Sequence, residues 1–201
     1  AAPDAIATPS STTATRPNVL FLAIDDLNDW IGALGKRSDV KTPNIDALTR
    51  RGVLFTRAYC AAPACNPSRT ALLTGIRPST SGVYHNNQPW RPVLKDAVTL
   101  PQHFMAAGYT VQGGGKIFHN SFNDSPSWQT WFREPANPSP PGTPVNGLNA
   151  GHFDWGPLDV DDEAMGDHAV VSWGIRFLQR SHERPFFLAV GLIRPHLPFY
   201  A

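Results

Sequence analysis

Residues 65–75 read Cys-Asn-Pro-Ser-Arg-Thr-Ala-Leu-Leu-Thr-Gly, and the rest of the chain is arranged around them. Residues 63–67 are small and turn-prone, whereas residues 69–73 can form a helix that Gly75 ends. Cys65 is therefore expected just ahead of a helix N-terminus, where free N–H groups and the helix dipole favour an anion. Arg69 lies about one turn further on and can reach back towards the cysteine with a rigid cationic group. The run predicts an anion pocket around one reactive side chain.

Residues 18–24 form a short, almost wholly apolar run that ends abruptly in Asp25 and Asp26. Such a run suits a central strand that is covered on both faces. Two adjacent carboxylates at the end of a buried strand repel each other and lose solvation, and a divalent cation with oxygen ligands would offset both effects. A solvated turn explains the pair equally well from these residues alone.

Helix and strand signals alternate through the middle of the chain. Thr42 is the expected N-cap of the first helix, and Pro43 occupies its first position. Thr99 is expected to cap the next helix in the same way. The predicted elements, in order, are a helix from 42 to 52, a strand over residues 53–59, a helix over residues 99–107 and a strand over residues 109–112.

Three glycines, residues 113–115, separate the last of these strands from Lys116 and His119. They do not form a phosphate-binding P-loop, which requires Gly-Lys-Ser/Thr at a different spacing. Lys116 and His119 are one helical turn or one tight loop apart, so both can face the same anion. A surface lysine and a partly buried histidine are the alternative interpretation.

The last part of the chain combines a long loop with a second helix–strand pair. Residues 120–159 lack a clear period and predict a loop, although their aromatic residues favour order. Residues 162–181 are the longest predicted helix, and residues 185–191 form a second buried strand. His196 follows in Arg-Pro-His-Leu-Pro-Phe, where two prolines fix the backbone around it. Residues 85–87, His-Asn-Asn, are better explained as ordinary surface than as part of a sugar pocket.

This order of elements predicts an α/β domain with a largely parallel sheet. In such sheets, ligands bind beyond the carboxyl ends of the strands. The candidate residues follow strand ends and are expected at one edge of the sheet beside Cys65. These candidates are Asp25, Asp26, Lys116, His119 and His196.

Composition excludes several classes of protein. A chain of 201 residues fits one domain, and its net charge of +1 gives no reason to expect nucleic acid or an acidic membrane as partner. No apolar run reaches the ~20 residues that span a bilayer. Residues 1–16 are mostly Ala, Thr, Ser and Pro, which predicts a flexible leader ahead of a domain over residues 17–201. The Ala-Ala-Pro start suggests a secreted or periplasmic protein after signal cleavage.

Several segments together resemble one enzyme family. The run from Cys65, Cys-x-Pro-Ser-Arg-x-x-x-Leu-Thr-Gly, resembles the signature of the type I sulfatases. Asp-Asp at residues 25–26, Thr-Pro-Asn-Ile-Asp-Ala-Leu from Thr42, and Gly-Lys-x-Phe-His at residues 115–119 are similar to sulfatase segments. Pro-His-x-Pro-Phe around His196 resembles the iduronate-2-sulfatase-like branch. The resemblance covers residues 18 to 199 and implies an alkaline-phosphatase-like sandwich, incomplete here, with a parallel central sheet flanked by helices.

The resemblance also implies a mechanism. A maturation enzyme would oxidise Cys65 to formylglycine, whose hydrated aldehyde attacks the sulfur of a sulfated sugar or polysaccharide. Calcium would be bound at position 65 and by Asp25 and Asp26. Roles for the remaining candidates follow from the same resemblance: Arg69 and Lys116 would stabilise the developing charge, His119 would assist proton removal, and His196 would bind sulfate or protonate the leaving alcohol.

The chain departs from the family pattern at its end. Family members are longer, and their later part supplies further calcium ligands and another lysine that are not found here after His196. We therefore expect a fragment or one chain of a processed enzyme, with little turnover alone. The alternatives are a phosphoester or phosphonate hydrolase of the same superfamily and a non-catalytic carbohydrate-binding fragment. For Cys65 itself, the alternatives are a buried structural cysteine and a disulfide with Cys60.

Overall fold

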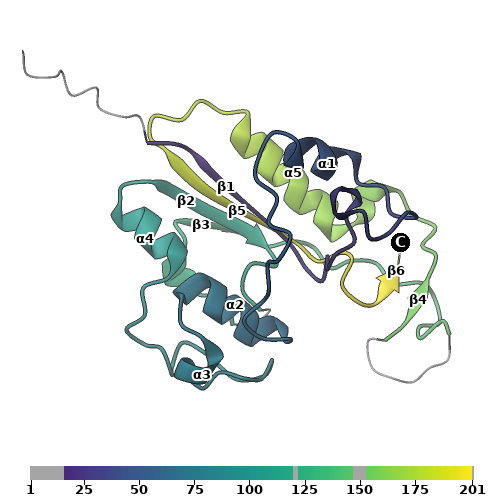
Figure 1. The fold of residues 1–201 in the computed structure, drawn as a ribbon, viewed down its shortest axis with the longest axis horizontal. Helices are drawn as coiled ribbons and strands as arrows, with labels where there is room; N and C mark the ends of the chain where they lie inside the picture. The colour runs from purple at the N-terminus through teal and green to yellow at the C-terminus, as the bar shows by residue number, and fades with distance from the viewer. Residues whose placement is uncertain (1–15, 120–121, 147–152, 201) are drawn as a thin grey trace, which may run out of the picture.

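The computed structural model describes residues 16–119, 122–146 and 153–200 (Figure 1). The elements, with η for a short 3-10 helix, are β1 (Val19–Ile24), η1 (Gly32–Leu34), α1 (Pro43–Thr49), α2 (Cys65–Thr74), α3 (Pro78–Ser81), α4 (Leu100–Ala106), β2 (Thr110–Gly115), η3 (Ser125–Ser127), β3 (Thr130–Phe132), β4 (Trp155–Gly156), η4 (Asp162–Ala164), α5 (Gly166–Leu178), β5 (Phe186–Leu192) and β6 (Phe199–Tyr200). None of the helices in this part of the chain has the length and apolar character needed to cross a membrane.

The main sheet confirms the predicted parallel α/β architecture. Its strand order is β1-β5-β2-β3, and each of the three pairings is parallel. β5 occupies an inner position because its apolar residues are buried on both faces. A separate parallel pair, β4 with β6, lies beyond the carboxyl end of β5. Because these strands are parallel, the carboxyl ends of β1, β2 and β5 lie at the same end of the main sheet.

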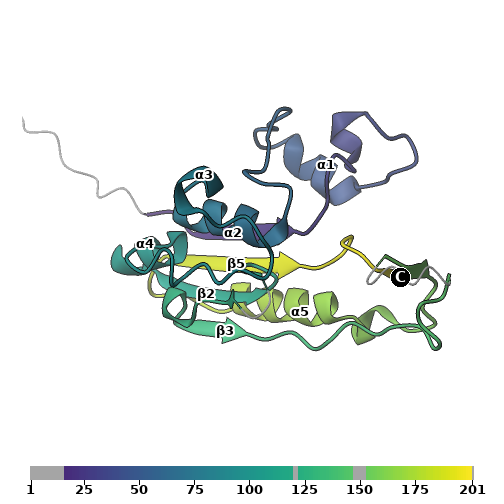
Figure 2. The same ribbon diagram turned by 90° about the horizontal axis from the view of Figure 1, so that it is seen from below.

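Helices cover both faces of this sheet, as Figure 2 shows. On one face, beside α2 and α4, Leu73 of α2 packs in a buried cluster with Val111 and Phe187. On the other face, Val170 and Phe177 of α5 pack against residues of β5. Each face of the sheet therefore has its own buried cluster under helices, which is the expected sandwich of a sheet between two helical layers.

The glycine run in β2 serves packing. A Cβ at Gly113 would lie 2.6 Å from the Trp128 ring, and a Cβ at Gly114 would lie 2.9 Å from Cβ of Phe132. Gly115 has φ +73 and lies against the backbone of Gly191, where any side chain would clash. These glycines let β2 approach its aromatic neighbours and let the chain turn sharply into Lys116.

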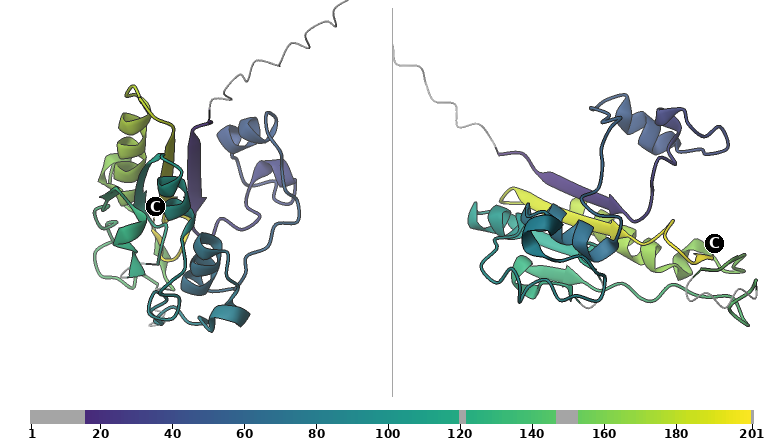
Figure 3. Two further views of the ribbon diagram at one scale, coloured as in Figure 1. Left: turned by 90° about the vertical axis from the view of Figure 1, so that its left-hand side faces the viewer. Right: turned by 60° about the horizontal axis from the view of Figure 1, so that its bottom comes forward.

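The prediction of a strand over residues 53–59 is wrong. This stretch has no regular structure, and Phe55 and Tyr59 are 77% and 87% exposed. The segment between β1 and α2 stands away from the sheet (Figure 3), so its backbone has no neighbouring strand with which to exchange hydrogen bonds within the described ranges. An apolar run can supply the pattern of a strand, but a partner strand is needed to form one.

Other boundaries differ in smaller ways. The long helix begins at Gly166 rather than at residue 162, because η4 occupies the preceding turn, and it ends at Leu178. The long loop over residues 120–159 contains the short strand β3, which adds to the sheet edge. The chain after Gly75 forms the short helix α3. Of the predicted leader over residues 1–16, residues 1–15 lie outside the described residues.

The two predicted N-cap residues, Thr42 and Thr99, behave differently in the structure. Thr99 forms the capping box of α4 with Gln102, as its sequence predicts. Thr42 does not cap α1 with its side chain; its hydroxyl donates instead to the carboxylate of Asp46 at 2.9 Å and accepts from the Gly32 N–H. The hydroxyl therefore ties α1 to the segment before it.

Candidate active site

Asp25 is the buried centre of the site. It directly follows β1, is 6% exposed, and its N–H donates to the Leu192 carbonyl at the end of β5. Its carboxylate contacts the guanidinium of Arg69, Nη2 to Oδ1 at 2.6 Å, and the ammonium of Lys116. Burial by itself would raise the pKa of Asp25, but the charges and hydrogen bonds of Arg69 and Lys116 outweigh it and lower the pKa. Asp25 is thus held as a carboxylate between two cations.

Cys65 lies at the first position of α2 and not ahead of the helix as expected. Position 67 is a proline, which has no N–H, and the N–H of Asn66 donates to Oδ1 of Asn86 at 2.9 Å. The helix start therefore offers fewer N–H groups to an anion than the sequence suggested. The positive charge near Cys65 comes mainly from side chains.

The thiol of Cys65 is kept protonated by its surroundings. Burial raises its pKa most, the negative charge of Asp25 raises it further, and the charges of Lys116 and Arg69 only partly oppose this. Both cysteines are free thiols, so the disulfide alternative with Cys60 does not apply to this structure. Because a thiolate is the reactive form of cysteine, an unmodified Cys65 is a weak nucleophile here.

Arg69 is aimed at Asp25 rather than back at the cysteine. Its Nη1 donates to the carbonyl of Ile117 at 2.9 Å and to the carbonyl of Lys116, while Nη2 donates to Asp25. A planar guanidinium can bind several acceptors at once, which a lysine ammonium cannot do in the same geometry. Arg69 therefore joins α2 to the ends of β1 and β2.

Lys116 and His119 follow the end of β2. Lys116 is 8% exposed, and its backbone N–H donates to the Gly191 carbonyl at 3.0 Å. Burial lowers the pKa of His119, and the charges of Lys116 and Arg69 lower it further. Nδ1 of His119 is buried without a hydrogen-bond partner. Burial and the two nearby cations thus favour the neutral imidazole form of His119.

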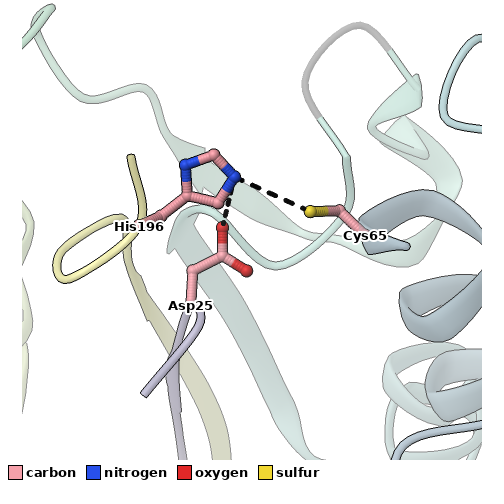
Figure 4. A group of neighbouring side chains, drawn as sticks. All are labelled: Asp25, Cys65 and His196. Carbon is pink, nitrogen blue, oxygen red and sulfur yellow. Dashed lines mark hydrogen bonds and ion pairs between the residues drawn. The ribbon is translucent and has the colours of Figure 1, made fainter. Parts of the chain in front are cut away.

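His196 faces Cys65 and Asp25, as Figure 4 shows. Its Nε2 lies 3.9 Å from Sγ of Cys65, 3.9 Å from Oδ2 of Asp25 and 3.7 Å from Oδ2 of Asp26. Nδ1 lies 2.5 Å from the carbonyl oxygen of Leu197, which assigns the proton of a neutral ring to Nδ1. The nitrogen that faces the site then carries a lone pair.

A cleft of 1170 Å³ adjoins this centre. Asp25, Asp26, Cys65 and Arg69 line it, together with apolar residues of the segment before α2 such as Phe55 and Tyr59. The Asp26 side chain is 59% exposed. The cleft gives the charged centre an open approach.

The site has the donor chemistry for a metal ion. Asp25, Cys65 and His196 each place one ligand atom within 4.8 Å of the others. The Oδ2 atom of Asp25 is buried, and the Lys116 ammonium lies beside it. The carboxylates of Asp25 and Asp26 are the hard oxygen ligands that calcium prefers, whereas a thiol and an imidazole suit softer ions. The two carboxylates therefore fit calcium, and the unmodified cysteine does not.

The structure thus gathers Asp25, Cys65, Arg69, Lys116 and His196, with Asp26 at the rim and His119 close by. Their catalytic roles remain predictions. Sequence reasoning missed Asn86, which lines the cleft and binds the start of α2. The only signal for Asn86 was a polar run inside a loop, which is common on ordinary protein surfaces.

Known proteins resemble this chain in sequence and in fold. A family model described as Sulfatase matches residues 17–201. A protein from Formosa agariphila named Sulfatase is 39% identical over 203 residues, which cover 92% of this chain and 40% of that protein. Human iduronate 2-sulfatase is 34% identical over 206 residues, which cover 96% of this chain and 37% of the human protein. The chain therefore spans about two fifths of the length of the curated relatives it matches.

Solved structures show the same fold. The phosphonate monoester hydrolase of Agrobacterium radiobacter matches with a TM-score of 0.66 and 23% identity, covering 90% of this chain and 41% of that one. At this identity the likeness concerns the fold alone. Because hydrolases of different esters share the fold, the fold does not choose the substrate.

Proposed function

Because this chain belongs to the sulfatase family, we propose that it supplies the catalytic centre of a hydrolase that removes sulfate from a sulfated sugar. One observation carries the proposal. The cysteine of the signature run lies beside a buried carboxylate, two cations and a histidine that come from four separate parts of the chain. Such a centre can bind a sulfate ester as an anion and act on it through a residue at position 65.

The nucleophile in this proposal is formylglycine formed from Cys65. The raised pKa of the thiol argues against a thiolate nucleophile. Oxidation by a maturation enzyme replaces the thiol with an aldehyde, and its hydrate supplies a hydroxyl group for attack on sulfur. The cysteine-dependent maturation also distinguishes this reading from a phosphoester or phosphonate hydrolase that uses serine or threonine.

The surrounding side chains then have separate tasks. Lys116 and Arg69 place positive charge where sulfate oxygens gain negative charge in the transition state. His119, which is neutral, accepts a proton from the hydrate. His196 presents Nε2 to the same centre, where the doubly protonated ring binds the sulfate ester or protonates the leaving alcohol.

Calcium would be held by Asp25 and Asp26, with position 65 as an oxygen ligand once it is modified. When bound there, calcium would supply a Lewis acid that neutralises charge on the sulfate oxygens. Calcium takes about six to eight oxygen ligands. Two carboxylates supply only part of this number, so the remaining oxygens belong to the substrate, to water or to further chain.

The substrate class that we favour is a sulfated uronic acid or hexose within a polysaccharide. The relative named iduronate 2-sulfatase supports this choice, since the chain is 34% identical to it. A location outside the cytoplasm, secreted or periplasmic, is part of the proposal. A non-catalytic sugar-binding fragment is the competing function.

The decisive experiment is the mass of the tryptic peptide over residues 58–69, from protein produced with and without the maturation enzyme. Conversion should give a peptide lighter than the cysteine form, together with reactivity to an aldehyde probe. Cys60, in the same peptide, is the internal control, since it should keep its thiol. An unmodified thiol at position 65 under both conditions would remove the mechanism and favour the sugar-binding fragment.

A further inference from the structure

His196 is carried by a loop without regular structure between β5 and β6, so contacts with the rest of the fold are needed to hold the loop in place. The ring approaches three different groups at 3.7–3.9 Å, and a displacement of about 1 Å in such a site can cost on the order of 100-fold in rate. Asp167 is the residue that meets this requirement.

Asp167 lies in the first turn of α5 and uses both carboxylate oxygens on the loop. Oδ1 accepts the N–H of Ile193 at 2.9 Å, and Oδ2 accepts the N–H of Arg194 at 2.8 Å. Hydrogen bonds to a carboxylate are stronger than those between neutral groups, and two parallel bonds also fix orientation. The beginning of the His196 loop is therefore locked to the helix.

Two further hydrogen bonds connect Ile193 and Arg194 to His196. The N–H of His196 donates to the Ile193 carbonyl at 2.9 Å, which closes a turn. Nη1 of Arg194 donates to the His196 carbonyl at 3.1 Å. The residues that Asp167 binds are thus the same two that hold the backbone of His196.

Charge supports the same arrangement. Burial lowers the pKa of Arg194, and the negative charge of Asp167 opposes that effect. A partly buried guanidinium needs a nearby anion. Asp167 therefore supports Arg194 in its contact with His196, besides binding the backbone.

We propose that Asp167 is a positioning residue that sets His196 against Cys65 and Asp25. The proposal rests on the proposed function for its catalytic consequence, although the contact itself does not depend on it. The substitution Asp167→Asn keeps the shape of the side chain but turns one acceptor into a donor that opposes a backbone N–H.

The test uses the full-length protein that contains this chain and a sulfated uronate disaccharide as substrate. Asp167→Asn should lower kcat/KM about 10- to 100-fold, the range typical when a residue behind a site group is lost. Asp162→Asn is the matched control, because it removes an exposed carboxylate just before the same helix, and it should change kcat/KM less than about twofold.

A double-mutant cycle shows whether the effect passes through His196. In a His196→Gln background, Asp167→Asn should change kcat/KM by less than about threefold, because the positioned group is already gone. Asp167→Glu provides a second variant that keeps the negative charge beside Arg194 while displacing both acceptor oxygens. The same factor of loss in both backgrounds would show a general structural role and overturn the proposal.

Hydrogen exchange of the segment 192–200, followed by mass spectrometry, gives a readout without activity. Asp167→Asn should speed exchange in this segment, whereas Asp162→Asn should not. If the wild-type protein fails to hydrolyse the sulfate ester, the proposed function is wrong. The contact of Asp167 with the His196 loop is then tested by hydrogen exchange alone. Unchanged exchange in Asp167→Asn and Asp167→Glu would overturn the proposal in either case.

Discussion

The guanidinium of Arg69 lies 2.6 Å from the carboxylate of Asp25, and both side chains are nearly buried, at 10% and 7% exposure. This contact joins the end of β1 to the helix that begins with Cys65. It brings together two segments that are far apart in sequence, and it offsets the desolvation cost of burying the Asp25 carboxylate.

Removing Arg69 should destabilise the protein strongly. Arg69→Ala leaves a buried carboxylate with one cation fewer and should lower the free energy of unfolding by about 3–5 kcal/mol, measured by urea denaturation. Arg37→Ala is the control, because its ion pair with Asp39 is exposed and should leave stability unchanged within error. Equal losses for the two variants would contradict the role given to burial.

Unmodified Cys65 should react slowly with alkylating agents. Its pKa is raised by burial and by Asp25, whereas Cys60 is exposed. In protein made without the maturation enzyme, iodoacetamide at pH 8 should label Cys65 on the order of tenfold more slowly than Cys60. Tandem mass spectrometry of residues 58–69 separates the two sites, and equal labelling rates would argue against a protonated thiol.

Gly191 should be required for the position of Lys116. A Cβ at Gly191 would lie 2.4 Å from the carbonyl group of Lys116, so Gly191→Ala forces the two strand ends apart. We expect a loss of about 1–3 kcal/mol in unfolding free energy together with a large drop in kcat. Gly52→Ala is the control, since its nearest contact is 3.4 Å and ordinary. Similar melting temperatures for both variants would refute this expectation.

The contact between Asp154 and Tyr200 should make stability depend on pH at both extremes. Burial would raise the pKa of Asp154, but hydrogen bonds from Tyr200 and from backbone N–H groups lower it below the ordinary 3.8. Burial, and then Asp154, raise the pKa of Tyr200 from 10.0 to about 12. A lowered carboxyl pKa stabilises the fold above pH 3.8 and loses this effect as pH falls through the folded value. A raised phenol pKa stabilises the fold below pH 10 and loses the effect as pH rises towards 12.

Melting temperatures of wild type, Asp154→Asn and Tyr200→Phe across this range test the assignment. The difference between wild type and Asp154→Asn should be constant near neutral pH and shrink in acid. The difference between wild type and Tyr200→Phe should shrink above pH 10. Parallel curves for all three proteins would show that the contact does not couple to protonation.

Local sequence determined much of the fold. The apolar run that became β5 is buried because a parallel strand between neighbours needs apolar residues on both faces. The prediction that residues 18–24 form a central strand covered on both faces is wrong, because β1 is the outermost strand of the described sheet and Leu20 and Leu22 are 51% and 52% exposed. Thr99 predicted the start of α4, since capping involves only residues three positions apart. The residues of the site were also visible, because strand ends in a parallel sheet meet at one edge and Asp25, Lys116 and His196 each follow such an end.

Tertiary structure decided what depends on distant partners. Residues 53–59 carry the pattern of a strand but have no strand beside them in the described chain, and no local pattern reveals that. Arg69 could have reached Cys65 or Asp25, and only the packing of α2 against β1 and β2 selects Asp25. Asp167 gave no signal at all, because its two acceptor oxygens meet N–H groups 26 and 27 residues away. Sequence by itself indicated which side chains belong to the site, whereas long-range contacts determined which groups those side chains bind. The reason is that hydrogen bonds and charges act through space and not along the chain.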